Sequence, residues 1–232
     1  MADAVSLVDL KFEYRKGRPV LDIPSMQVAA GERVFLFGPS GSGKTTLLGL
    51  MAGVLRTTVG QVQILGQDLV KMSPSQRDAF RGSHVGYIFQ LFNLIPYLTV
   101  EENITLSCRL SPERRKRLAG KSLEAAARDV AARLGIDGLL KESVTALSVG
   151  QQQRVAAARA LIGTPELVVA DEPTSSLDHD HRERFIELLF EATKAAGSTL
   201  IFVSHDRTLQ PLFDRAIALP DINRASKLEA AA

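Results

Sequence analysis

The glycine-rich run at residues 38–46, Gly-Pro-Ser-Gly-Ser-Gly-Lys-Thr-Thr, constrains the fold of this chain more than any other segment. It follows the apolar residues 33–37 and opens a helix-like stretch at residues 47–52, so it is predicted to form a turn from a strand into a helix. Glycines accept backbone angles that a Cβ resists, which lets successive amide groups converge on phosphate oxygens at a helix N-terminus. The run therefore predicts a cradle for the phosphates of a nucleotide.

The residue types in this run indicate how a nucleoside triphosphate would be held. Lys44 is expected to neutralise the β- and γ-phosphates, and Thr45 is expected to bind magnesium. A plain glycine-rich turn is the alternative, but four specified positions between a strand and a helix disfavour it. The predicted nucleotide contacts of the run are Gly38, Pro39, Ser40, Gly41, Ser42, Gly43, Lys44, Thr45 and Thr46.

Size and charge narrow the class of protein. The chain has 232 residues, of which 45% are hydrophobic and 23% charged, so it can bury a substantial core. This length fits one large domain, or one domain with a subdomain. The formal net charge is only +2, and because a nucleic-acid partner calls for a strongly basic face, no such partner is expected.

The cysteine count and the N-terminus bear on the compartment. Cys108 is the only cysteine and cannot form an internal disulfide, which fits a reducing compartment. The chain begins without a basic region followed by an apolar core, and it has no apolar run of roughly 18 residues that could span a bilayer. We therefore expect a cytoplasmic chain that reaches a membrane only through a partner.

Short segments rich in branched and aromatic residues predict the strands of the chain. They are residues 5–14, 20–28, 33–37, 61–65, 85–89, 167–171, 199–204 and 215–219. Helical patterns separate the later segments, which favours a parallel sheet, whereas the first segments follow one another across short turns, which favours an antiparallel one. The expected fold class is α/β, with a mixed sheet core and a small antiparallel β subdomain.

Residues 91–146 have a different character, because strand signals vanish there and helical periodicity takes over. Within residues 122–134, one helix face would carry Leu123, Ala127, Val130 and Leu134. We predict a helical subdomain inserted into a single domain that spans residues 1–232. The dense basic run at residues 112–118 is interpreted as a solvated helix face, with contact to lipid headgroups or a partner as the alternative.

A second nucleotide element is the apolar segment at residues 167–170, which ends in Asp171 and Glu172. Two carboxylates at the carboxyl end of a parallel strand are suited to a magnesium site. Asp171 is expected to bind magnesium or its water, and Glu172 to polarise the attacking water. Such a pair is weak evidence alone, and the phosphate cradle in the same chain is what favours this interpretation.

Residues 147–154 read Leu-Ser-Val-Gly-Gln-Gln-Gln-Arg and lead directly into a helical segment. Here the sequence resembles the ABC-type ATPases, a class of P-loop NTPases whose signature is Leu-Ser-Gly-Gly-Gln. The resemblance implies that Ser148, Gly150 and Gln151 contact ATP bound to a second copy of the chain, in a head-to-tail homodimer with two ATP molecules. One position departs from the pattern, because Val149 replaces the first signature glycine; altered local backbone freedom is expected there.

Further positions match the same family in chain order. By resemblance, Tyr14 stacks on adenine, although a tyrosine at a strand end is more often packing. Gln90 reaches magnesium and the attacking water, and its loop reports to a membrane partner. Asp178 belongs to the loop that crosses the dimer interface, and His205 contacts the γ-phosphate. The implied catalytic residues are Lys44, Gln90, Glu172 and His205, and the implied magnesium ligands are Thr45, Gln90 and Asp171.

Three functional classes use such a cassette. The favoured one is the ATP-hydrolysing motor of a membrane transporter. Residues 89–104 resemble the lipoprotein-releasing and macrolide-export type of cassette, and this resemblance implies a system that exports cargo or transmits force across the membrane. Its partners would be integral membrane subunits, and it would lie on the inner face of the cell membrane. The alternatives are a cell-division cassette that controls wall hydrolases through a membrane partner, and a soluble cassette of ribosome or DNA metabolism. Cargo contacts are expected in the membrane subunits.

Overall fold

The computed structural model describes residues 3–175 and 179–225, and the chain forms two compact units. The first unit combines the N-terminal part, up to residue 81, with the C-terminal part from residue 199 onward. The second unit comprises residues 82–198. Both units contain strands and helices, which confirms the predicted α/β class.

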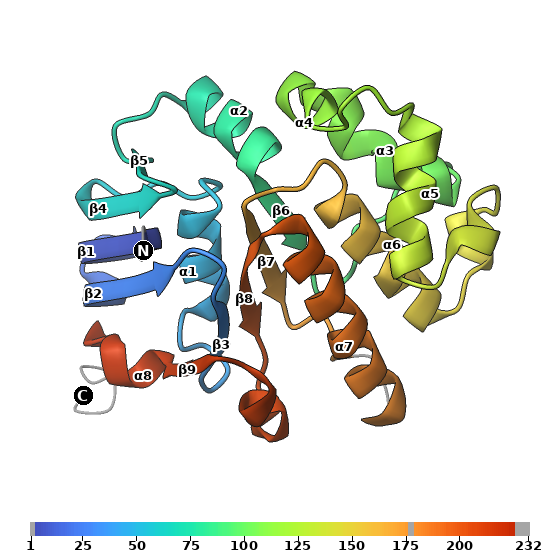
Figure 1. Cartoon of the computed structure of the whole chain (residues 1–232). Helices are drawn as coiled ribbons and strands as arrows, with labels where there is room; N and C mark the ends of the chain where they lie inside the picture. The colour runs from blue at the N-terminus through green and yellow to red at the C-terminus, as the bar shows by residue number, and fades with distance from the viewer. Residues whose placement is uncertain (1–2, 176–178, 226–232) are drawn as a thin grey trace. The chain divides into compact units, whose positions relative to one another are not determined.

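An antiparallel sheet in the first unit joins strands in the order β2-β1-β4-β5 (Figure 1). Their bounds are β1 (Asp3–Arg15), β2 (Arg18–Ala29), β4 (Val59–Ile64) and β5 (Gln67–Asp68). Leu7 of β1 lies opposite both Met26 and Val62, and all three side chains are buried. This confirms the antiparallel part of the prediction, whereas the two-residue β5 is too short to carry a periodic signal.

Parallel strands make up the rest of the sheet structure in the first unit. Strand β3 (Arg33–Phe37) pairs in parallel with both β8 (Thr199–Val203) and β9 (Arg215–Ala218). Every residue of β8 is buried, which is the expected character of a parallel strand covered on both faces. The helical elements that lie wholly in this unit are α1 (Lys44–Met51), η3 (Arg207–Leu212) and α8 (Leu219–Ile222), and it also includes α2 (Pro74–His84) up to Arg81.

Helices dominate the second unit. The end of α2, from Gly82 to His84, belongs to this unit and leads into β6 (Val85–Ile88), which pairs in parallel with β7 (Leu167–Asp171). The remaining elements are α3 (Val100–Leu110), α4 (Pro112–Lys116), α5 (Leu123–Arg133), η1 (Asp137–Leu139), η2 (Val144–Ala146), α6 (Val149–Leu161) and α7 (His179–Ala196). Helices α3, α5 and α6 pack together (Figure 1). The unit covers more of the sequence than the predicted insertion at residues 91–146, because it also includes β6, β7, α6 and α7.

The basic run in and after α4 is not a uniformly solvated face, and this interpretation was wrong for Arg114. Its side chain is only 2% exposed, and it donates hydrogen bonds to the carbonyl oxygens of Val85 at 2.6 Å, Ala160 at 3.1 Å and Ile162 at 3.2 Å. Burial lowers the pKa of Arg114 to about 10, so the guanidinium stays charged at neutral pH. Arg114 therefore joins α4 to the start of β6 and the end of α6.

None of the helices among residues 3–175 and 179–225 combines the length and the apolar character needed to cross a membrane.

Candidate nucleotide site

Glycine is required at two positions of the loop between β3 and α1. Gly41 has φ of 80° and Gly43 has φ of 96°, both in the left-handed region that a Cβ disfavours. Gly43 is also crowded, because a Cβ there would lie 2.9 Å from Cδ2 of Leu21. Gly43 is the residue at which α1 is capped, so the amide groups at the start of α1 belong to this loop.

Two polar side chains make this loop suitable for phosphate. The Nζ of Lys44 is buried against the loop and donates hydrogen bonds to the carbonyl oxygens of Gly38 and Pro39, each at 2.9 Å. An ammonium group has three donors, so one is left for a ligand. The Oγ of Ser42 is buried and has no hydrogen-bond partner among the described residues. A phosphate oxygen would satisfy both groups, because it accepts from a hydroxyl and from an ammonium.

The first unit also carries Tyr14 and His205, which the resemblance assigns to the adenine and the γ-phosphate of ATP. Tyr14 is 63% exposed, and its hydroxyl forms a 3.2 Å hydrogen bond with Oγ1 of Thr46. The exposed His205 follows β8, and the amide of Ser204 donates to the carbonyl of Leu36 at 3.3 Å. Because β3 and β8 are parallel, His205 lies at the same carboxyl edge as the phosphate loop.

The second unit gathers the predicted catalytic carboxylates and the glutamine at one strand edge. Ile88 pairs with Ala170, so Gln90 and Asp171 both lie at the carboxyl ends of β6 and β7. Asp171 is buried and Glu172 is half-buried, with a left-handed φ of 44°. The pKa of Tyr87 is raised by burial and, to a smaller degree, by the charge of Asp171.

The signature forms a capped helix start. The Oγ of Ser148 accepts the amide of Gln151 at 3.3 Å, and the Oε1 of Gln151 accepts the amide of Ser148 at 2.9 Å. This reciprocal pair is a capping box, which leaves the first turn of α6 well defined. Val149 is 47% exposed and is the first residue of α6, where helical backbone is compatible with a β-branched side chain. The contacts of Ser148, Gly150 and Gln151 with ATP remain predictions, and Asp178 lies outside the described residues.

Three buried polar residues near these motifs were missed by the sequence analysis. Gln153 donates to the carbonyl oxygen of Pro173 at 2.6 Å, which links α6 to the segment after Glu172. Arg159, further along α6, donates to backbone carbonyls of the loop after Gln90. Asn223 donates to the carbonyl oxygen of Ser42. No local signal in the sequence distinguishes these residues: Gln153 is one of three successive glutamines, Arg159 could equally have faced solvent, and nothing near Asn223 indicates its role.

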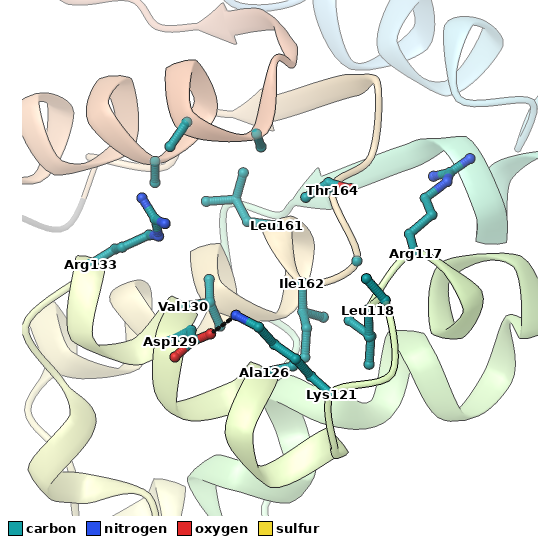
Figure 2. Close-up of a pocket in the computed structure, with 15 residues that line it drawn as sticks. Arg117, Leu118, Lys121, Ala126, Asp129, Val130, Arg133, Leu161, Ile162 and Thr164 are labelled. Carbon is teal, nitrogen blue, oxygen red and sulfur yellow. Dashed lines mark hydrogen bonds and ion pairs between the residues drawn. The ribbon is translucent and has the colours of Figure 1, made fainter.

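A cavity of about 320 Å³ in the second unit is separate from these motifs (Figure 2). Its apolar lining includes Leu118, Leu161 and Ile162, and an ion pair between Lys121 and Asp129 lies beside it. None of the predicted site residues lines it. Leu161 is the last residue of α6, whereas the signature lies at the start of that helix, so this cavity is not the predicted nucleotide site.

The fold, the phosphate loop and the signature define an ABC-type ATPase cassette, and comparison with known proteins establishes the family. Residues 21–175 match the family described as ABC transporter. The chain therefore belongs to the ABC transporter family, as an ATP-binding and ATP-hydrolysing subunit of a transporter.

The chain is similar over nearly its whole length to several bacterial cassettes. It is 38% identical to an uncharacterised ABC transporter ATP-binding protein of Mycobacterium tuberculosis, covering 97% of this chain and 92% of that protein. It is also 38% identical to the lipoprotein-releasing system ATP-binding protein LolD 2 of Rhodospirillum rubrum, covering 95% and 94%. With the macrolide export ATP-binding/permease protein MacB of Syntrophobacter fumaroxidans it shares 37% identity over 94% of this chain but only 31% of that longer protein.

A solved structure supports the same assignment. The dimeric, post-hydrolysis state of an ATP-binding cassette bound to ADP and Pi has a TM-score of 0.78 and 31% identity, and the match covers 92% of this chain and 93% of that one.

Proposed function

We propose that this chain is the motor subunit of an exporter or force-transmitting transporter in the cell membrane, in which two copies close around two ATP molecules and move an integral membrane partner. The phosphate loop carries the proposal, because its buried Ser42 hydroxyl and its folded-back Lys44 fit the phosphates of ATP. The relatives named for lipoprotein release and macrolide export support the transporter subtype. The dimeric state of the similar cassette with ADP and Pi supports closure of two copies.

The remaining site residues follow from this proposal. Magnesium would be held by Thr45, Gln90 and Asp171, whose hydroxyl, amide and carboxylate oxygens are the donors that this ion prefers. When bound, it would neutralise charge on the phosphate oxygens. Glu172 polarises the attacking water, while Lys44 and His205 stabilise the charge on the transferring phosphoryl group.

The loop that follows Gln90 offers a contact for a membrane partner. Leu91 and Tyr97 are each 83% exposed, and apolar side chains exposed in this way favour burial against another protein. A partner in the membrane would hold this chain on the cytoplasmic face, and a displacement of the loop would reach Gln90 directly through the chain. Closure then moves the partner because ATP binds more tightly to the closed than to the open state.

Capture of the closed state tests the proposal. A tagged Glu172→Gln chain would be mixed with ATP, magnesium and detergent-solubilised native membranes, and co-purifying proteins identified by mass spectrometry. We expect a stoichiometric membrane protein with few spans and a large external domain. A matched chain that also carries Leu91→Asp and Tyr97→Asp should still bind ATP but capture much less of it. Recovery of ribosomal or DNA-repair proteins without a membrane protein would contradict the transporter assignment.

A further inference from the structure

The loop at residues 91–98, between β6 and α3, has an unusual backbone that other residues must hold in place. It contains turns but no helix or strand, and Phe92 and Asn93 have left-handed φ angles of 59° and 49°. Two successive non-glycine residues in this region are energetically costly. The loop nevertheless leaves Leu91 and Tyr97 exposed, so contacts below the loop must stabilise it.

Arg159 of α6 provides the first of these contacts. Its side chain is 9% exposed, with Nη2 donating to the carbonyl oxygen of Phe92 at 2.5 Å and Nη1 donating to that of Asn93 at 2.6 Å. The two acceptors are the carbonyls of the left-handed residues themselves. A planar guanidinium can hold two neighbouring acceptors at once, which a lysine ammonium does less well. Burial lowers the pKa of Arg159, and these carbonyl dipoles offset part of that cost.

Asn103 and Ser107 of α3 complete the support. The Oδ1 of Asn103 accepts the amide of Ile95 at 2.8 Å, and its Nδ2 donates to the carbonyls of Ile95 at 3.1 Å and Leu98 at 3.3 Å. The hydroxyl of Ser107 donates to the backbone carbonyl of Arg159 at 2.9 Å. The loop is therefore attached at its first part to α6 and at its second part to α3, and these helices are attached to each other.

Helix α6 connects this loop to the signature. Ser148 caps the helix, and Arg159 lies eleven residues further on, about 16 Å along the axis at 1.5 Å per residue. A hydrogen-bonded helix of this length moves as a rigid rod, so a displacement at one end is felt at the other. Gln153 lies between the two ends and binds the carbonyl of Pro173, just after Glu172.

We propose that Arg159 is a positioning residue that fixes the loop after Gln90 to the signature helix, so that a displacement of the loop changes the position of Ser148 and Gly150. The inference rests on the proposed function, in which the loop contacts the membrane partner and the signature contacts ATP on the second copy. Arg159 itself touches neither.

The test compares ATP hydrolysis and hydrogen exchange in purified full-length variants. Arg159→Met should lower kcat about tenfold, which corresponds to a coupling free energy of the size found between distant sites in proteins. Hydrogen exchange of the backbone amides at residues 91–98 should become faster. KM for ATP should change less than about twofold, because the phosphate loop is untouched. Arg159→Lys keeps the charge but not the two-pronged geometry, and should recover part of kcat and part of the protection in the loop.

Arg114→Met is the matched control, since Arg114 is also a buried arginine of the second unit that donates to backbone carbonyls, but not to those of the loop. It should lower thermal stability at least as much as Arg159→Met, yet leave the exchange of residues 91–98 and kcat near the parent values. If Arg114→Met reproduces the pattern of Arg159→Met, the effect is general destabilisation and the inference is wrong.

Ser148→Ala separates this inference from the function on which it rests. If Ser148→Ala leaves kcat unchanged, the signature does not act on ATP and the proposed function fails. If Ser148→Ala lowers kcat but Arg159→Met quickens loop exchange without lowering kcat, only the role of Arg159 is overturned. If Arg159→Met does not yield folded protein, Arg159→Lys takes its place. Faster hydrogen exchange of the loop in Arg159→Lys, with kcat equal to that of the parent chain, would then contradict the role of Arg159.

Discussion

At the scale of single residues, the support of the phosphate loop depends on a side chain far away in the sequence. The buried Asn223 accepts the amide of Asp22 at 2.8 Å and donates to the carbonyl oxygens of Val20 at 2.9 Å and Ser42 at 3.4 Å. Val20 lies 203 positions earlier in the chain, so no local pattern around Asn223 could have predicted this role. The loop itself was predictable because its glycines and lysine are adjacent in sequence.

Replacing Asn223 should therefore affect both stability and nucleotide binding. Asn223→Ala removes a partner from three partly buried backbone groups, and we expect the free energy of unfolding in urea to fall by about 2 kcal/mol. The KM for ATP should rise a few-fold, since the carbonyl of Ser42 is no longer held. Asp221→Ala is the control, because Asp221 is exposed on α8, the short helix that Asn223 follows, and its loss should change stability by less than about 0.5 kcal/mol. An unchanged KM in Asn223→Ala would contradict the supporting role.

At the scale of elements, the core strands were predicted well because a parallel strand covered on both faces is a short, continuous apolar run in the sequence. The predicted segments at residues 33–37 and 167–171 coincide with β3 and β7. The basic run around α4 was misread because composition cannot distinguish an arginine that faces solvent from one that meets carbonyl groups. Arg114 and Arg159 both belong to this second kind, and only the packing of helices against β6 and its following loop reveals it.

Two capped helices allow the function of the signature to be separated from its structural role. Thr99 caps α3 and Ser148 caps α6, each in a capping box. Thr99→Ala and Ser148→Ala should each lower the free energy of unfolding by about 1 kcal/mol, as loss of a helix cap usually does. Only Ser148→Ala should also reduce ATP hydrolysis strongly. Equal hydrolysis by the two variants at saturating ATP would indicate that Ser148 is a cap and nothing more.

The pairing of β3 with β9 should be sensitive to acid. The pKa of Asp214 is lowered chiefly by its side-chain hydrogen bond with Arg33, which joins the starts of these two strands. A lowered pKa means that the stabilisation is complete above the ordinary aspartate pKa of about 4 and is lost as pH falls through the lowered value. Urea unfolding between pH 3 and 7 should show a smaller acid-induced loss for Asp214→Asn than for the parent chain. Parallel curves would mean that the pair contributes nothing to pH dependence.

At the scale of the whole molecule, the proposed head-to-tail dimer makes each ATP site a combination of two copies. The phosphate loop would come from one copy and the signature from the other. A copy with Lys44→Ala keeps a complete signature, and a copy with Ser148→Ala keeps a complete phosphate loop. In a mixed dimer, one site therefore combines the two intact parts, while the other combines the two altered parts.

Mixing these copies should restore nucleotide trapping that neither has alone. With Glu172→Gln in both copies to prevent turnover, each preparation by itself should retain little labelled ATP after gel filtration. Random pairing makes about half of the dimers mixed, so an equal mixture should retain ATP at about a quarter of its sites. Only a site shared between two copies can regain an intact phosphate loop and an intact signature when the copies exchange partners. If the mixture retains no more labelled ATP than the average of the separate preparations, each copy completes its own site and the proposed head-to-tail dimer is wrong.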